Sequence, residues 1–336
     1  MKVYFLTAGD PQLSVNRIYI ENMARWLSKY CEQIGRGNII ESGYDVYICS
    51  KYSDVRDIKK LRNKNPNSII GIVHPSDANR HVSAKMLLAD FFLVGSIEEH
   101  DYYNYYCSNI FRFPQIEEID VKRRVHCDRS PLLIGYHGNL EHLNESSRVL
   151  KSALERLHKN HPIKMIVVYN QQLGKWKKGK PNVPIEFIDW TFDNMVREMS
   201  KVDVGIVPCV NDSFLDRNRN NSGELSKIIK RLNGRVSDYS LQFKNNANNG
   251  RALVFHQLGI PVVADFWPCH FEILSSEENG YLAHSEESWY LSLSKLANSS
   301  EIRQSTANNA YEVSKLKYDP LIWAKKFYEY LKKISK

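Results

Sequence analysis

Short apolar runs alternate with amphipathic stretches along the chain, and this alternation predicts strands and helices in turn. In the first half, strands are predicted at 3–6, 45–49, 68–75, 90–96 and 109–114. Helices are predicted between them at 15–30 and 54–64, where apolar residues recur at helical spacing. Ser96 is expected to cap a further helix, with Glu98 and Glu99 in its first turn. Strand–helix alternation of this kind favours a parallel, doubly wound sheet.

The pattern stops at Glu117–Arg129, which is polar and charged, and then starts again. In the second half, strands are predicted at 132–137, 164–169, 185–188 and 203–208, and helices at 143–157, 193–201 and 320–333. A chain of 336 residues exceeds one average core. We therefore expect two lobes, at 1–125 and 126–318, and a C-terminal helix at 319–336.

Two segments of the second half need separate mention. The stretch 211–249 is rich in Asn, Ser, Arg and Lys, and we expect a loop there with a short helix at 224–232. The helix near the C-terminus is amphipathic. Its expected buried face consists of Ile322, Trp323, Phe327, Tyr330 and Leu331.

The most informative stretch of the chain is 248–283. An apolar helix is predicted over 252–258, with Gly259 in the position after the helix that glycine favours. Pro261 forces an extended entry into a core strand at 262–264, and Asp265 stands where the chain leaves that strand. A second helix is predicted to begin at Phe271–Leu274, before an Asn–Gly turn at 279–280.

This order of elements resembles the donor-binding segment of nucleotide-sugar glycosyltransferases of the GT-B superfamily, with a donor lobe similar to that of families 1 and 4. The sequences Lys-Val-Asp-Val-Gly-Ile-Val-Pro at 201–208 and Leu-Gly-Ile-Pro-Val-Val-Ala at 258–264 extend the resemblance over residues 130–330. It implies an α/β fold of two facing Rossmann-like lobes with parallel sheets, and a C-terminal helix that crosses back to the first lobe.

The resemblance also implies an activity. We expect transfer of a sugar from a nucleotide-sugar donor to a glycan or lipid-linked acceptor in surface polysaccharide biosynthesis, with a retaining outcome and without a metal. Two rival interpretations stay open. One is a sugar-nucleotide epimerase, which uses the same two lobes, and the other is a non-catalytic protein that binds nucleotides or glycans.

Composition and charge indicate which ligands and which cellular compartment fit this chain. The chain is 43% hydrophobic and 25% charged, and its net charge of +8 fits an anionic ligand. Six scattered cysteines without a C-x-x-C pair are typical of a cytoplasmic protein with reduced thiols. The basic helix 56–64 and the lysines after 324 fit either an anionic membrane surface at its inner face or solvated helix faces. No nucleic-acid module is recognisable.

A departing diphosphate must be neutralised, and without Asp-x-Asp for a metal the candidates are basic side chains and helix amides. Lys244 and Arg251 flank Asn249 and Gly250 at the start of the key helix, and we expect this cluster to hold the phosphates. A solvated polar loop is the alternative. His137, Gly138 and Asn139 follow the first strand of the second lobe, where a glycine turn lets backbone approach a phosphate or simply makes a tight turn.

Related retaining enzymes place two glutamates eight residues apart near this helix. In this sequence the corresponding positions hold Asn246 and Val254, so the usual ribose carboxylate is absent. The nucleotide and the stereochemical outcome therefore stay open. Glu272 is a candidate contact to the donor hydroxyls, or else a charge at a helix N-terminus.

In the first lobe, His74 ends a strand and is a candidate base or acceptor-orienting group, with Asp77 three residues further on. A histidine that bonds a backbone carbonyl is the alternative. We expect one site between the lobes, lined by His74, Gly138, Lys244 and Arg251. The segment Gly174–Lys180 has P-loop spacing, but Pro181 stands where Ser or Thr should follow and no helix is predicted after it.

Overall fold

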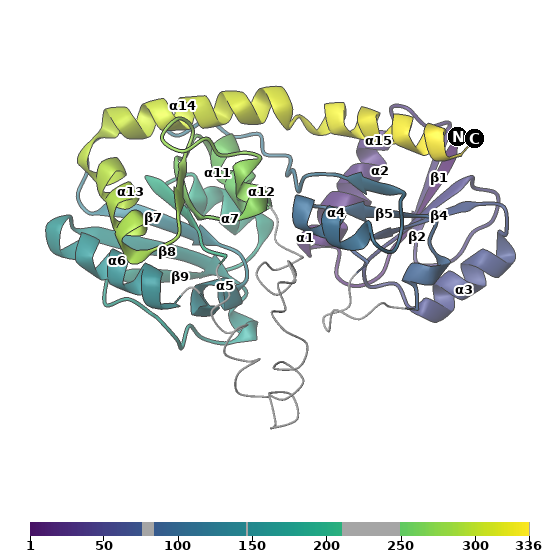
Figure 1. Ribbon diagram of the computed structural model, residues 1–336, viewed down its shortest axis with the longest axis horizontal. Helices are drawn as coiled ribbons and strands as arrows, with labels where there is room; N and C mark the ends of the chain where they lie inside the picture. The colour runs from purple at the N-terminus through teal and green to yellow at the C-terminus, as the bar shows by residue number, and fades with distance from the viewer. Residues whose placement is uncertain (76–83, 146, 210–248, 336) are drawn as a thin grey trace, which may run out of the picture. The chain divides into compact units, whose positions relative to one another are not determined.

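The computed structural model describes residues 1–75, 84–145, 147–209 and 249–335 (Figure 1). The chain divides into two compact units, Met1–Glu118 with Tyr318–Lys336, and Ile119–Lys317. Each unit contains a six-stranded sheet in which every pairing is parallel. The predicted α/β class and the parallel sheets are therefore confirmed.

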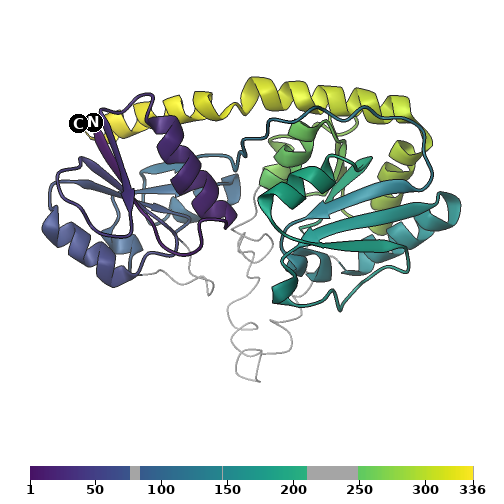
Figure 2. The same cartoon turned by 180° about the vertical axis from the view of Figure 1, so that it is seen from behind.

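The sheet of the first unit has the order β2-β1-β3-β4-β5-β6. Its strands are β1 (Lys2–Leu6), β2 (Gln33–Gly37), β3 (Val46–Cys49), β4 (Ile69–Val73), β5 (Phe91–Val94) and β6 (Ile110–Arg112). Its helical segments are α1 (Ser14–Asn16), η1 (Arg17–Asn22), α2 (Met23–Leu27), α3 (Val55–Lys64), η2 (Met86–Leu88), α4 (Ile97–Tyr103) and α15 (Pro320–Ile334). In Figure 2 the purple helical segment 14–27 lies over one face of this sheet.

The C-terminal helix α15 belongs to this first unit, as the resemblance implied. Its Phe327 packs against Phe111, with ring centroids 4.9 Å apart, and it contacts Phe91 as well. Apolar burial of this kind stabilises the return of the chain to the first sheet. The predicted buried face is wrong at Ile322, whose side chain is 45% exposed.

The edge strand β2 was not predicted, because the segment is polar and contains two glycines. Gly35 lies under the rings of Tyr4 and Tyr44, and a Cβ at Gly35 would come within 2.5 Å of Tyr4. Two tyrosines of neighbouring segments thus supply the apolar cover that the strand itself lacks. Parallel pairing with β1 then fixes its register, with Gly35 opposite Tyr4.

The sheet of the second unit has the order β12-β11-β10-β7-β8-β9. Its strands are β7 (Leu132–His137), β8 (Ile163–Tyr169), β9 (Ile185–Asp189), β10 (Val204–Val207), β11 (Val262–Asp265) and β12 (Tyr281–Ala283). Its helical segments are α5 (Leu140–Glu145), α6 (Ser147–Asn160), η3 (Gln171–Leu173), α7 (Phe192–Met199), α11 (Gly250–Leu258), α12 (Pro268–Phe271), α13 (Glu286–Asn298) and α14 (Ser300–Lys317).

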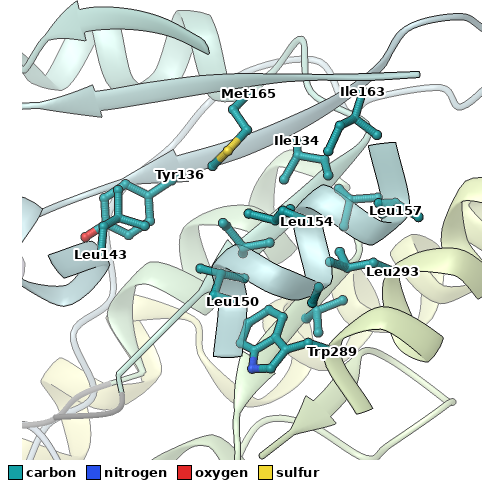
Figure 3. Close-up of a cluster of buried hydrophobic side chains, with 14 of the residues drawn as sticks. Ile134, Tyr136, Leu143, Leu150, Leu154, Leu157, Ile163, Met165, Trp289 and Leu293 are labelled. Atoms are coloured by element: carbon teal, nitrogen blue, oxygen red, sulfur yellow. The ribbon is translucent and has the colours of Figure 1, made fainter. Parts of the chain in front are cut away.

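Helices cover both faces of this second sheet. On one face, Leu154 of α6 and Trp289 of α13 pack with Ile134 and Met165 in the core cluster drawn in Figure 3. On the other face the strands carry glycine where a helix comes close. A Cβ at Gly205 would lie 2.6 Å from the ring of Phe255 on α11. The missing side chain therefore lets α11 lie close against the sheet.

The key segment behaves largely as its sequence predicts. Gly259 ends α11 in the left-handed region with φ 72°, which confirms its expected position after the helix. The helix expected at 271–274 is wrong, because Pro268 starts α12 early and that helix ends at Phe271. The amide of Asn279 then fixes the following turn, since it donates to Ile273 O and its oxygen accepts from Ser275 N.

Candidate phosphate and base sites

The carboxyl edge of the second sheet brings several sequence-predicted residues together. β7 and β11 both pair with β10, so the segments that follow these three strands meet at one edge. Gly138 follows β7, Pro208 and Cys209 follow β10, and α11 begins at Gly250. The first amides of a helix have no partner within the helix, so this end of α11 attracts anions.

Arg251 stands in the first turn of α11 and is held in place from one side. Its Nη2 donates to Pro208 O at 3.0 Å and contacts Cys209 Sγ at 2.9 Å. Its Nη1 is buried and has no hydrogen-bond partner in the part of the chain that the structure describes. Burial lowers the pKa of Arg251, but Cys209, Tyr136 and Asp265 raise it above its usual value in sum. The guanidinium therefore stays charged, with one nitrogen still able to bind an acceptor.

Gly138 lies directly beside this arginine. Its φ of +127° lies in a region that residues with a side chain rarely adopt, and a Cβ there would come within 3.0 Å of Arg251 Cδ. Any larger residue would therefore press on the arginine stem. The glycine therefore leaves room for the stem of Arg251.

The remaining candidates of this cluster take different roles. His137 is buried, and its ring lies 5.1 Å from that of Phe255, so it packs against α11. Asn139 is exposed and its Oδ1 accepts from Glu141 N at 3.0 Å, which caps α5. Asn249 is buried, and its Oδ1 has no hydrogen-bond partner among the residues that the structure describes. Glu272 is half-buried at the C-terminal end of α12, so the alternative of a helix N-terminal charge is wrong. Lys244 lies outside the described residues.

Three buried residues complete this cluster, and sequence reasoning missed their roles. Asp265 ends β11, and its carboxylate accepts from Cys209 N and from Trp289 Nε1. His270 Nδ1 donates to Asp265 O at 2.7 Å, which leaves Nε2 facing Cys209 Sγ at 3.9 Å. Burial lowers the pKa of His270 to about 4, so the ring is neutral near pH 7. Together these contacts fix the position of Cys209 Sγ, which Arg251 Nη2 contacts.

In the first unit, the histidine candidate is paired with a carboxylate. His74 follows β4, and its Nδ1 lies 2.6 Å from Glu99 Oε1. Glu99 Oε2 accepts from Gly95 N at 2.7 Å, so both carboxylate oxygens are engaged. The alternative of a backbone carbonyl as the partner of Nδ1 is therefore wrong. Glu99 was predicted only as a helix-end charge, and Asp77 lies outside the described residues.

The geometry around His74 is that of a residue held in place. It has a φ of 43°, unusual for a residue other than glycine, and backbone outliers of this kind cluster at functional sites. The ring of Tyr19 stands perpendicular to the imidazole at 4.7 Å. Nε2 of His74 is buried and has no hydrogen-bond partner within residues 1–75, 84–145, 147–209 and 249–335. The imidazole is thus oriented through Nδ1 and retains an acceptor nitrogen.

These two clusters lie in different units, at the carboxyl edges of different sheets. The expectation that His74 and Arg251 serve one site stays a prediction. Every helix within the described ranges is too short or too polar to span a bilayer.

No protein-family model and no curated protein matches this chain. Several solved structures match it in fold. Sucrose-phosphate synthase from Thermosynechococcus elongatus is 10% identical with a TM-score of 0.64, over 99% of this chain and 98% of that one. HepE from Anabaena in complex with UDP-glucose is 11% identical with a TM-score of 0.63, over 99% and 100%. TarM is 12% identical with a TM-score of 0.54, over 92% of this chain but only 57% of its own length.

At this level of identity the likeness establishes the fold. The chain has the GT-B fold, and its structural neighbours are glycosyltransferases.

Proposed function

We propose that this chain is a glycosyltransferase that moves a hexosyl or related group from a nucleotide sugar to a glycan or lipid-linked acceptor. Arg251 carries the proposal. Its guanidinium is anchored by Pro208 O and Cys209 Sγ, while Nη1 is buried beside Gly138 and has no hydrogen-bond partner among the described residues. A half-buried guanidinium with an unused donor at a helix N-terminus is suited to a phosphate group.

In the proposed reaction, Arg251 and the N-terminal amides of α11 stabilise the leaving group. When the bond between the sugar and the diphosphate breaks, negative charge grows on the leaving diphosphate. Arg251 and the first amides of α11 stabilise that charge in place of a metal ion. Gly138 leaves room for the phosphate to approach. Because the donors are already fixed, little reorganisation is needed as the charge develops.

His74 binds a hydroxyl group of the donor sugar or of the acceptor. With Nδ1 directed to Glu99, its Nε2 accepts a hydrogen bond from a hydroxyl group. Under the retaining outcome that the resemblance implies, this contact orients a hydroxyl. The same pairing favours inversion as the second candidate, because a histidine oriented by a carboxylate can take the acceptor proton during in-line displacement. The anomeric configuration of the product, read by proton NMR, separates the two.

The proposed setting is surface polysaccharide synthesis on the cytoplasmic side of a membrane, with peripheral attachment. Exposed lysines at 325, 326, 332 and 333 of α15 support attachment to anionic lipid. HepE has been solved with UDP-glucose and with UDP, so UDP-sugars are the first donors to try.

The test is a panel of nucleotide sugars with a panel of glycan and lipid-linked acceptors, with release of the nucleoside diphosphate as the readout. The proposal expects release that depends on the acceptor and a new glycosidic product. Conversion of the sugar nucleotide without any acceptor would show an epimerase. Thermal stabilisation by nucleotides with no turnover across the panel would show a binding protein.

A further inference from the structure

We propose that residues 174–180, called here the lysine loop, bind a glycan chain that carries phosphate, sulfate or carboxylate groups. The loop follows η3 at the carboxyl end of β8, and β8 lies next to β7 in the sheet. It therefore stands at the same sheet edge as Gly138. The strand β9 follows it at Ile185, not a helix, so it is not a nucleotide-binding P-loop.

The shape of the lysine loop is fixed from inside. Trp176 is 6% exposed and belongs to the core cluster of the second unit. Its Nε1 donates to Lys178 O at 2.7 Å, and Lys178 N donates to Asn144 Oδ1 at 3.3 Å. Gly174 and Gly179 have φ values of +117° and +66°, which favour glycine. Because the backbone is held in this way, the loop presents its side chains in a defined arrangement.

The side chains that this loop presents are four exposed lysines, at 175, 177, 178 and 180. Within the described ranges, none of them forms an ion pair with an acidic side chain, and Lys180 lies 5.2 Å from the ring of Phe187. Four like charges within seven residues repel one another. A bound polyanion relieves this repulsion and replaces it with attraction, which favours an extended anionic partner.

The composition of the lysine loop does not favour nucleic acid or an anionic membrane surface as the partner. Nucleic-acid grooves offer several aromatic rings on which successive bases stack, whereas Trp176 of the loop is buried and the neighbouring Phe187 is only 36% exposed. Peripheral membrane segments insert apolar side chains, and the exposed side chains of this loop are all lysines. A hydrophilic, charged glycan needs neither feature. Under the proposed function this glycan is the acceptor, so that part of the inference rests on the proposed transfer activity.

The test compares dextran sulfate with neutral dextran of equal size, by fluorescence anisotropy and without nucleotide sugar. The loop variant is Lys175→Gln with Lys177→Gln, Lys178→Gln and Lys180→Gln. The control removes the same charge at four exposed lysines scattered over the rest of the chain, as Lys29→Gln with Lys122→Gln, Lys159→Gln and Lys315→Gln. All eight lysines are exposed, so both variants are expected to fold, which circular dichroism checks.

The parent is expected to bind dextran sulfate and not dextran, with a Kd that rises steeply from about 0.01 M to about 1 M salt as charges are screened. The loop variant should bind about tenfold more weakly or worse, and the control should change less than about twofold. Equal binding by the loop variant, or an equal loss in the control, overturns the proposal. So does loop-dependent preference for single-stranded DNA or phosphatidylserine vesicles. Because no donor is present, failed binding is separate from failed transfer.

Discussion

The Nδ1 atom of His74 lies 2.6 Å from Glu99 Oε1, although the two residues are 25 positions apart in the chain. The pairing exists because β4 and β5 are neighbours in the sheet, so that the segments after them converge. It leaves Nε2 as the proton acceptor of the imidazole.

Glu99→Gln should therefore lower kcat with little change in KM. One side-chain oxygen of glutamine can accept from Gly95 N, and its amide NH₂ then faces His74 Nδ1. The ring must adopt the tautomer that carries hydrogen on Nε2, which cannot accept. Under the inverting candidate, in which His74 takes the acceptor proton, we expect a loss of about 100-fold and an altered pH–rate profile.

Asp101→Asn is the matched control for this experiment, because it neutralises an exposed carboxylate on the same helix. It should leave both kinetic constants and the pH profile near those of the parent. A Glu99→Gln protein with the parental pH profile would show that Glu99 has only a structural role.

The chelator experiment addresses the expected absence of a metal. If Arg251 and the amides of α11 hold the diphosphate, then EDTA should not change the shift in melting temperature that a nucleoside diphosphate produces. Loss of that shift with EDTA, and its recovery with Mg²⁺ or Mn²⁺, would contradict the prediction.

The fold was largely predictable because its strands are short, apolar and rich in β-branched residues, and Gly259 marked a helix end. The edge strand β2 was not, since its apolar cover comes from Tyr4 and Tyr44 in neighbouring segments. Sequence also pointed to Arg251 at the entrance of α11. It could not supply the partner of His74 or the contact of Cys209 with His270. Those contacts join residues 25 and 61 positions apart, and sheet order alone brings them together.

His256 offers a prediction about stability. The side chain is fully buried in α11, and within the described ranges neither ring nitrogen has a hydrogen-bond partner. A buried polar group without a partner costs about 1–3 kcal/mol. His256→Leu removes both nitrogens and keeps an apolar side chain, so it should raise the free energy of unfolding by about 1 kcal/mol near pH 7. Urea unfolding measures this, with the exposed His284→Leu as control. A variant less stable than the parent would contradict the argument.

The same histidine predicts how stability depends on pH. Burial lowers its pKa from 6.5 to about 3 in the folded protein, whereas the unfolded chain keeps the ordinary value. The unfolded state therefore binds more protons below pH 6.5, and the folded state loses stability as the pH falls from there toward 3. Each pH unit costs about 1.4 kcal/mol per group.

Between pH 7 and pH 5 His256 should account for a loss of about 2 kcal/mol, and His270, with a pKa lowered to about 4, should add to the loss. His256→Leu should lose about 2 kcal/mol less than the parent over this interval in urea unfolding. Parallel pH curves for the two proteins would show that His256 does not contribute.

Substitution of Arg251 is the most direct test of the proposed function. A guanidinium binds phosphate through paired, directional hydrogen bonds, and these strengthen as the leaving group gains charge. Arg251→Ala should therefore reduce kcat by about 100-fold or more, with a smaller effect on donor affinity. Arg251→Lys should restore only part of the rate, because an ammonium group keeps the charge but not the fork.

Folding should survive in both variants, because Arg251 is half-buried at the polar entrance of α11 and outside the apolar core cluster of its unit. Arg197→Ala, which removes an exposed arginine from α7, is the matched control and should keep the parental rate. Melting temperatures check folding, and product release under single-turnover conditions separates the chemical step from donor binding. If the alanine variant is folded and transfers sugar at the parental rate, the leaving phosphate is stabilised by other groups and the clamp assigned to Arg251 is wrong.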